Sequence, residues 1–186
     1  MKIINLFGGP GAGKTTLAYY LAYRFKQAGF RAELVGEAAR EILYDRNPPA
    51  TGGTAAQLLD NQLMITGQQA ERIKRLERHG IEIAIADSPL FMGLLYVNDT
   101  DMRRSLWQAI NTFQNAMPTP INVFCRRTAG QYDKESRAQS ETEAILIDNR
   151  ILKTFDFDPT SSFVHRWGQE ADTFAYLLQE TKREWN

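Results

Sequence analysis

Short apolar runs alternate with amphipathic segments along this 186-residue chain. Each apolar run has the length of a strand, and the segments between them carry apolar residues at helical spacing. The run at 81–86 ends without any polar residue, which is typical of a strand buried on both faces of a parallel sheet. This order predicts a doubly wound α/β fold with five parallel strands. Strands are expected at 3–7, 32–35, 81–86, 121–125 and 162–165.

Helical spacing is found between all of these strands. The first helix is expected to end near Gln27 because Gly29 is a natural stop, and Gly80 ends a long helix in the same way. That long helix has its apolar positions at Leu58, Leu59, Leu63, Ile65, Ile73 and Leu76. Helices are expected at 37–45, 54–79, 90–96, 102–116, 141–154 and 171–181, with a breaker-rich loop at 47–53.

Composition favours one globular domain over residues 1–186, because 43% of the residues are hydrophobic and can build a core. Lys+Arg and Asp+Glu both number 22, so nucleic-acid binding would need a local basic patch. No apolar run approaches the roughly 20 residues of a membrane span. The single cysteine, Cys125, lies in an expected strand and cannot form an internal disulfide, which agrees with a reducing compartment. A soluble cytoplasmic protein without a membrane partner is therefore predicted.

A glycine-rich stretch joins the first strand to the first helix. It meets the pattern G-x-x-x-x-G-K-[ST], in which loop amides surround phosphate oxygens and the lysine adds a cation. A plain glycine-rich turn is the alternative, but the strand before and the helix after favour a P-loop. The dinucleotide fingerprint G-x-G-x-x-G fails, since Lys14 or Thr16 stands at its last glycine. The predicted ATP-binding residues are Gly8, Gly9, Pro10, Gly11, Ala12, Gly13, Lys14, Thr15 and Thr16.

Carboxylates follow two of the strands at the edge where such sheets bind ligands. Asp87 is expected to hold Mg²⁺ together with the Thr15 hydroxyl, and the alternative is an N-cap of the next helix. Glu37 is a candidate base for an acceptor hydroxyl, and a helix N-terminal charge is an equally good interpretation from the residues alone.

Basic residues bound a polar segment after the fourth strand, and we expect a lid at about 126–138 there. Arginines of a closing lid can stabilise a transferring phosphoryl group and exclude water. The basic residues are Arg126, Arg127, Lys134 and Arg137, and Arg126 and Arg137 are better candidates than Lys134. The alternative is a solvated charged loop. A second basic run lies on the long helix, where a solvated face is the default and a resting place for a polyanion is the alternative. It consists of Arg72, Lys74, Arg75, Arg78 and His79.

With these motifs in place, the chain resembles the thymidylate-kinase-like P-loop kinases, including deoxynucleoside kinases. The similarity is greatest to small bacteriophage kinases that phosphorylate 5-hydroxymethyluridine in DNA during thymidine hypermodification. The matching positions are Gly8 to Thr15, Glu37, Gln62 with Gln69, Asp87-Ser88-Pro89-Leu90, and Tyr132 with Arg137-Ala138-Gln139. Two departures are Ser136, where the lid usually has glycine, and the loop at 48–53.

The resemblance implies an ATP- and Mg²⁺-dependent kinase with Glu37 as base, acting in the host cytoplasm if phage-encoded. In this hypothesis Lys14, Asp87, Arg126 and Arg137 serve transfer, and Gln69 and Arg40 orient the pyrimidine or its phosphate. Two alternatives stay open: a kinase of a free nucleoside or nucleoside monophosphate, and a nucleotide-dependent switch or assembly ATPase. The absence of an N-K-x-D signature weakens a GTPase switch. The sequence is compatible with a monomer or a dimer.

Overall fold

The computed structural model describes residues 1–39, 55–127, 140–155 and 163–183. Its centre is a five-stranded sheet in the order β2-β3-β1-β4-β5, and all four neighbouring pairs are parallel. The expected α/β fold with five parallel strands is therefore confirmed. The strands are β1 (Lys2–Phe7), β2 (Ala32–Val35), β3 (Ile83–Ala86), β4 (Ile121–Arg126) and β5 (Phe163–Arg166).

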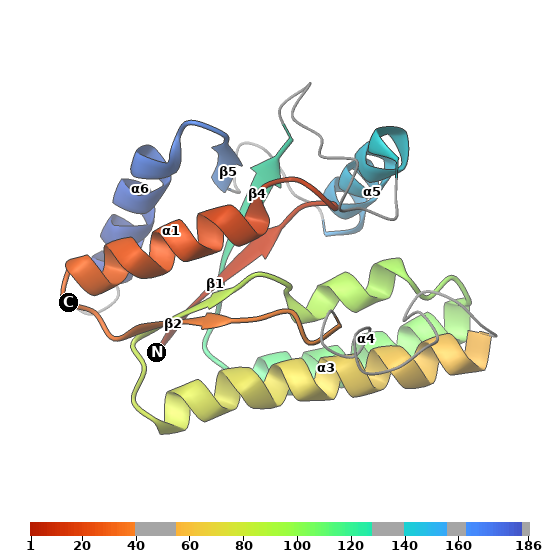
Figure 1. Cartoon of the computed structure of the whole chain (residues 1–186). Helices are drawn as coiled ribbons and strands as arrows, with labels where there is room; N and C mark the ends of the chain where they lie inside the picture. The colour runs from red at the N-terminus through yellow and green to blue at the C-terminus, as the bar shows by residue number, and fades with distance from the viewer. Residues whose placement is uncertain (40–54, 128–139, 156–162, 184–186) are drawn as a thin grey trace.

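Helices cover both faces of the sheet (Figure 1). In that view α1 and α6 lie on one side, and α3 and α4 lie on the other. The helical elements are α1 (Lys14–Gln27), α3 (Ala55–Arg78), the 3-10 helix η1 (Leu90–Leu95), α4 (Thr100–Asn115), α5 (Glu141–Thr154) and α6 (Glu170–Arg183). A helical turn starts at Ala38, and the rest of the helix expected at 37–45 lies outside the described residues.

The core follows from the alternation of side chains along the strands. Ile4 and Leu6 of β1 pack with residues of α1 and α6, such as Phe25 and Leu177. Ile3, on the opposite face, packs with Ile73 of α3. All six of these side chains are buried, so β1 contributes to the core on both faces, as expected for a central parallel strand.

Two helical expectations need correction. Residues 90–95 form a 3-10 helix, and Gly93 sits in it where a Cβ atom would come within 2.9 Å of Gln62 Oε1. On α3, Leu63 is 37% exposed, whereas Gln62, Thr66 and Gln69 are buried. The inward stripe of α3 is thus polar beside η1 and apolar further on, at Ala70 and Ile73, while the side chain of Leu58 lies outside the described part.

Within the described residues, no helix combines the length and the apolar character that a membrane crossing requires.

Candidate functional site

The P-loop bends where its glycines adopt positive φ. Gly8, Gly11 and Gly13 have φ values of 148°, 76° and 81°, in the region that favours glycine. At Gly8 a Cβ atom would also lie 2.9 Å from the backbone oxygen of Cys125. Gly13 is the N-cap residue of α1, and among the described residues no side chain caps this helix. The first amides of α1, with the positive end of its dipole, therefore suit an anion.

Lys14 lies at the mouth of this loop. Its Nζ donates a hydrogen bond of 3.1 Å to the backbone oxygen of Gly9, which keeps the ammonium group on the concave side of the turn. Trp167, directly after β5, borders the loop from another direction, since its ring lies 3.6 Å from where a Cβ atom of Gly13 would be. The Trp167 side chain is half exposed, so this ring forms part of the surface around the P-loop.

Asp87 and Thr15 meet beside the loop. The Thr15 hydroxyl donates to Asp87 Oδ2 over 2.6 Å, although the two residues are far apart in the sequence. The N-cap of η1 is Pro89, and no side chain in the described ranges caps that helix, so Asp87 does not act as its N-cap. Asp87 is buried, and its Oδ1 has no hydrogen-bond partner among the described residues.

These two residues fit a magnesium ion. Mg²⁺ prefers oxygen ligands and usually combines one or two protein oxygens with phosphate and water. A buried carboxylate oxygen that lacks a partner, next to a hydroxyl, is such a donor set. Within the described residues, no group of three or more His, Cys, Asp or Glu side chains could hold a metal. A magnesium site here would therefore include oxygens from the nucleotide.

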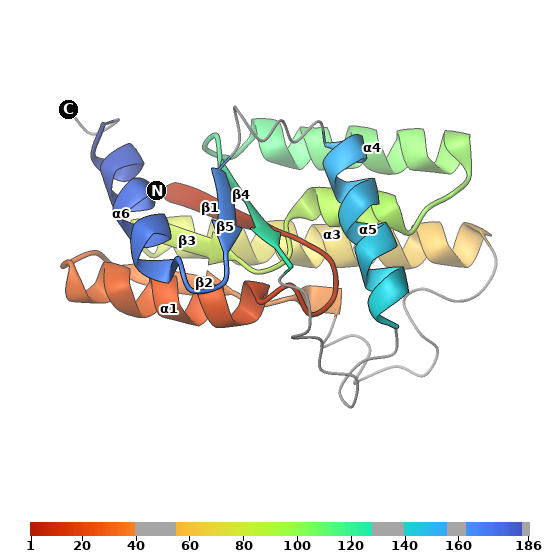
Figure 2. The same cartoon turned by 90° about the horizontal axis from the view of Figure 1, so that it is seen from above.

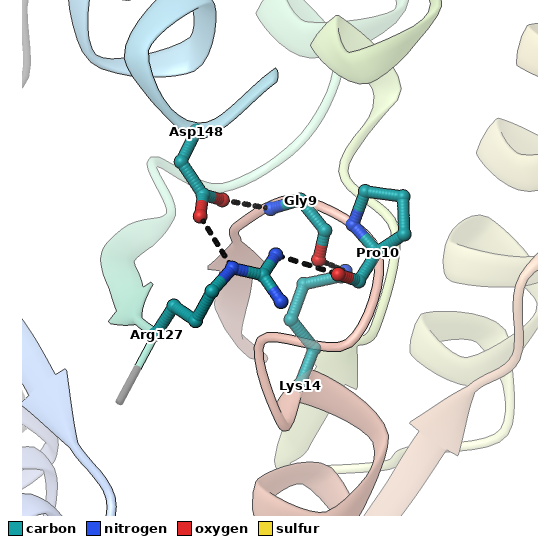
Figure 3. A network of polar contacts seen from close by, with 5 residues as sticks. All are labelled: Gly9, Pro10, Lys14, Arg127 and Asp148. Carbon is teal, nitrogen blue, oxygen red and sulfur yellow. Dashed lines mark hydrogen bonds and ion pairs between the residues drawn. The ribbon is translucent and has the colours of Figure 1, made fainter. Parts of the chain in front are cut away.

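A second polar network, not expected from the sequence, lies on the outer side of the P-loop (Figure 3). Asp148 Oδ1, on α5, accepts a hydrogen bond of 2.5 Å from the Gly9 amide. Asp148 Oδ2 forms an ion pair of 3.1 Å with Arg127 Nε. Arg127 Nη2 in turn donates to the backbone oxygen of Pro10 over 2.6 Å. The side chains of Arg127 and Asp148 are only 8% and 11% exposed. Because both charges are buried, each needs the other as its partner, and the pair holds α5 and the end of β4 against the P-loop.

The structure thus separates two arginines that are adjacent in sequence. Arg127 turns back onto the P-loop, whereas Arg126 is exposed at the end of β4, beside Arg166 of β5. Over the described part of the chain, the side chain of Arg126 makes no hydrogen bond or ion pair. Arg137 and the rest of the expected lid after Arg127 lie outside the described residues.

Glu37 follows β2 close to Asp87. The Asp87 amide donates to the backbone oxygen of Val35, two residues before Glu37, over 3.3 Å. Burial raises the pKa of Tyr96, and the negative charge of Glu37 raises it further. Glu37 is therefore near enough to the end of η1 to act on the Tyr96 phenol electrostatically.

Gln69 connects α3 to the same corner. Its Oε1 accepts a hydrogen bond of 3.1 Å from the Ala38 amide, directly after Glu37. The side chain is buried, and within the described segments its Nε2 has no hydrogen-bond partner. A buried amide with an unused donor suits a ligand carbonyl. Arg40, the other expected substrate residue, lies outside the described residues.

The basic run on α3 is largely engaged with the protein itself. Arg72 donates to the backbone oxygen of Gly36 over 3.2 Å, and Lys74 Nζ lies 5.3 Å from the centre of the Phe113 ring. Arg78 forms an ion pair with Glu71. Arg75 and His79 are exposed. The run therefore has the features of a solvated helix face whose charges are partly paired.

Cys125 lies beneath the P-loop and is fully buried. Burial raises the pKa of its thiol to about 12, against the opposing effect of Lys14. The thiol is therefore protonated at neutral pH, and Cys125 acts as a small apolar residue under Gly8.

A parallel sheet, a P-loop and an acid after β3 define a P-loop protein with a nucleotide-kinase-like fold. A family described as an AAA domain matches residues 3–157, so the chain belongs to that family. A search of curated proteins found no match.

Solved structures give the same fold. A crystal structure of "NadR protein in complex with NR" is 15% identical, with a TM-score of 0.66, over 90% of this chain and 45% of that one. A second NadR structure, in complex with NAD and AMP-PNP, is 17% identical, with a TM-score of 0.65, over 97% and 49%. The chain thus spans about half of the length of these NadR chains. Thymidylate kinase from Ehrlichia chaffeensis is 14% identical, with a TM-score of 0.63, over 95% of this chain and 98% of that one.

Proposed function

We propose that the protein is an ATP- and Mg²⁺-dependent kinase that phosphorylates an alcohol group. The contact between Thr15 and Asp87 carries this proposal, because it joins a P-loop hydroxyl to a buried carboxylate with an unused oxygen. AMP-PNP, an ATP analogue, is bound in one of the NadR structures, which supports ATP as the donor.

On the phosphate side, the loop amides and Lys14 bind the phosphate chain, and Lys14 stabilises negative charge on the transferring group. Thr15 and Asp87 would hold Mg²⁺, which when bound supplies positive charge at the phosphate oxygens. Arg126 and Arg137 are proposed to complete the charge stabilisation from the lid. Gly8 to Thr16 is the proposed cofactor-binding segment.

On the acceptor side, Glu37 is the proposed general base. Its carboxylate takes the proton of the acceptor hydroxyl while the hydroxyl oxygen bonds to the γ-phosphorus. The bond from that phosphorus to the bridging oxygen breaks, and ADP leaves with the bonding electrons. Gln69 and Arg40 are proposed to orient the acceptor, and the unused Nε2 donor of Gln69 supports this for Gln69.

The acceptor that we propose first is the hydroxymethyl group of 5-hydroxymethyluridine in DNA, on the strength of the resemblance to the phage kinases. A base in duplex DNA must leave the stack to reach Glu37, at a cost of a few kcal/mol.

A free nucleoside or nucleoside monophosphate is the second candidate. It is supported by the pairing of Arg72, Lys74 and Arg78 with other parts of the protein, which leaves less free positive charge on α3 for DNA. The NadR structure that contains NR and the thymidylate kinase structure also support this candidate.

Transfer of labelled γ-phosphate tests the proposal. The purified protein is incubated with ATP and Mg²⁺ and with single-stranded or duplex DNA containing 5-hydroxymethyluracil, free nucleosides or nucleoside monophosphates. Label on the modified DNA alone supports the first acceptor, and label on the free compounds alone overturns it in favour of the second. Steady ATP hydrolysis that no acceptor increases would instead indicate a switch or assembly ATPase.

A further inference from the structure

We propose that Asp148 is a positioning residue that holds the P-loop arm, Gly9 and Pro10, in the shape that binds a phosphate chain, with Arg127 as its bridge. The proposal rests on the proposed nucleotide-binding function and deepens it. Asp148 touches the loop from outside, so it acts through the backbone and through Arg127.

The network fixes the P-loop arm at two successive residues. Asp148 binds the Gly9 amide, and Arg127 binds the Pro10 carbonyl while paired with the same carboxylate (Figure 3). On the inner side, the Gly9 carbonyl accepts from Lys14 Nζ and, over 3.2 Å, from the Ala12 amide. The arm is therefore held between α5 outside and Lys14 inside.

The packing of α5 on the loop is close enough to require glycine. A Cβ atom at Gly9 would lie 2.7 Å from Asp148 Oδ1 and 2.9 Å from the backbone oxygen of Ala144. Figures 1 and 2 both show the segment after β1 passing beside α5 before it turns into α1. The position of α5 thus sets how far the P-loop arm stands from the amides of α1.

Charge balance explains why the acid comes with an arginine. A lone carboxylate behind an anion site would repel phosphate, and Arg127 cancels that charge locally. Burial raises the pKa of Asp148, while the Gly9 amide, Arg127 and Lys14 oppose the shift. A raised pKa means that ionised Asp148 costs stability as the pH rises through it. Asp148→Asn removes this cost but leaves the buried Arg127 unpaired, so the folding of the variant is measured before its affinity.

The test measures phosphate binding apart from transfer. Asparagine can still accept from Gly9, but its amide group cannot pair with Arg127. The uncancelled charge of Arg127 would by itself attract phosphate, so a loss of affinity reports the altered shape of the P-loop arm and not its charge. Isothermal titration with inorganic tripolyphosphate, and with ATP and Mg²⁺, should give a roughly tenfold or greater loss of affinity in Asp148→Asn. The matched control is Asn149→Ala, an exposed neighbour on α5, which should bind like the wild type.

A purely structural role would lower the unfolding temperature without changing affinity in the folded protein. All titrations therefore run below the unfolding transition of each variant, followed by circular dichroism. Arg127→Lys is the second variant: it keeps the charge but lacks the fork that reaches both Asp148 and Pro10, and it should also lose affinity. If Asp148→Asn does not fold, the affinity of Arg127→Lys tests the proposal in its place.

The outcomes separate the two proposals. A wild type that binds neither probe overturns the proposed function and this inference with it. A wild type that binds, beside folded variants of unchanged or higher affinity, overturns the inference alone. Loss of affinity in the variants with a normal control supports it.

Discussion

The two sides of the candidate site are built differently. On the phosphate side, short charge-assisted bonds tie the P-loop to other elements: Thr15 to Asp87 over 2.6 Å and Gly9 to Asp148 over 2.5 Å. On the acceptor side, the bond from Ala38 to Gln69 is a neutral amide contact of 3.1 Å. Bonds to charged groups are shorter and stronger than neutral ones. The phosphate side is therefore held to its neighbours by the stronger bonds.

The unused donors and acceptors also differ between the two sides. On the phosphate side, a carboxylate oxygen of Asp87 has no partner within the described segments, which suits a cation. The acceptor side keeps an amide nitrogen of Gln69 without a partner among the described residues, which suits a neutral carbonyl. We infer that the donor nucleotide is bound mainly through charge and that acceptor choice depends on neutral groups on α3.

The largest expected effect comes from removing the proposed base on the acceptor side, which should slow transfer without weakening ATP binding. Glu37→Gln should lower kcat by roughly 10²- to 10⁴-fold, because the base is lost, while the KM for ATP stays nearly unchanged. Steady-state kinetics with the acceptor found in the labelling experiment measures both. The control is Glu33→Gln, which makes the same change at a partly exposed glutamate of β2. An unchanged kcat in Glu37→Gln would remove this residue from the mechanism.

A smaller effect is expected from the phosphate side. Asp87→Asn should raise the Mg²⁺ concentration needed for half-maximal activity by roughly 10- to 100-fold, since a charged ligand becomes neutral. Thr15 can still donate to the asparagine oxygen, so the local fold should persist. Asp101→Asn, on the surface of α4, is the control in the Mg²⁺ titration. The same Mg²⁺ requirement in both variants would argue against a metal role for Asp87.

The acceptor side should respond more weakly and only to the acceptor. Gln69→Leu removes one neutral hydrogen bond to the ligand, which predicts a roughly tenfold higher acceptor KM and an unchanged ATP KM. Gln68→Ala, the exposed neighbour on α3, controls for changes in the helix. If the ATP KM rose together with the acceptor KM, the proposed division between the two sides would be wrong.

The fold could be predicted because its signals are local. The P-loop fixes the first strand, turn and helix, and the apolar runs mark the other strands within a few residues of their observed ends. Which residues of α3 face inward could not be predicted from apolar spacing, because polar Gln62, Thr66 and Gln69 are buried where the helix faces the site. Periodicity assigns Leu63 to the core and gives no reason to bury glutamines.

Asp148 could have been found from the sequence, whereas the role of Arg127 could not. Asp148 stands four residues after buried Ala144 and three before buried Ile151, so an acid interrupts the apolar face of α5. A charge at such a position indicates a buried partner. Arg126 and Arg127 are adjacent, and the path of the chain after β4 decides which of them turns back to the P-loop. No local sequence pattern encodes that path.

The smallest expected effect concerns the basic run on α3 and tests whether DNA rests on that face. The variant with both Arg75→Ala and Arg78→Ala should unfold at nearly the same denaturant midpoint as the wild type, because the Arg78 pair with Glu71 is exposed and screened by solvent. Its affinity for DNA, followed by fluorescence anisotropy at several salt concentrations, should equal that of the wild type. If DNA rests on this face, affinity should fall and the salt dependence should weaken by roughly one phosphate contact for each lost charge. That result would favour DNA as the acceptor and would place its binding on a surface outside the two sides compared above.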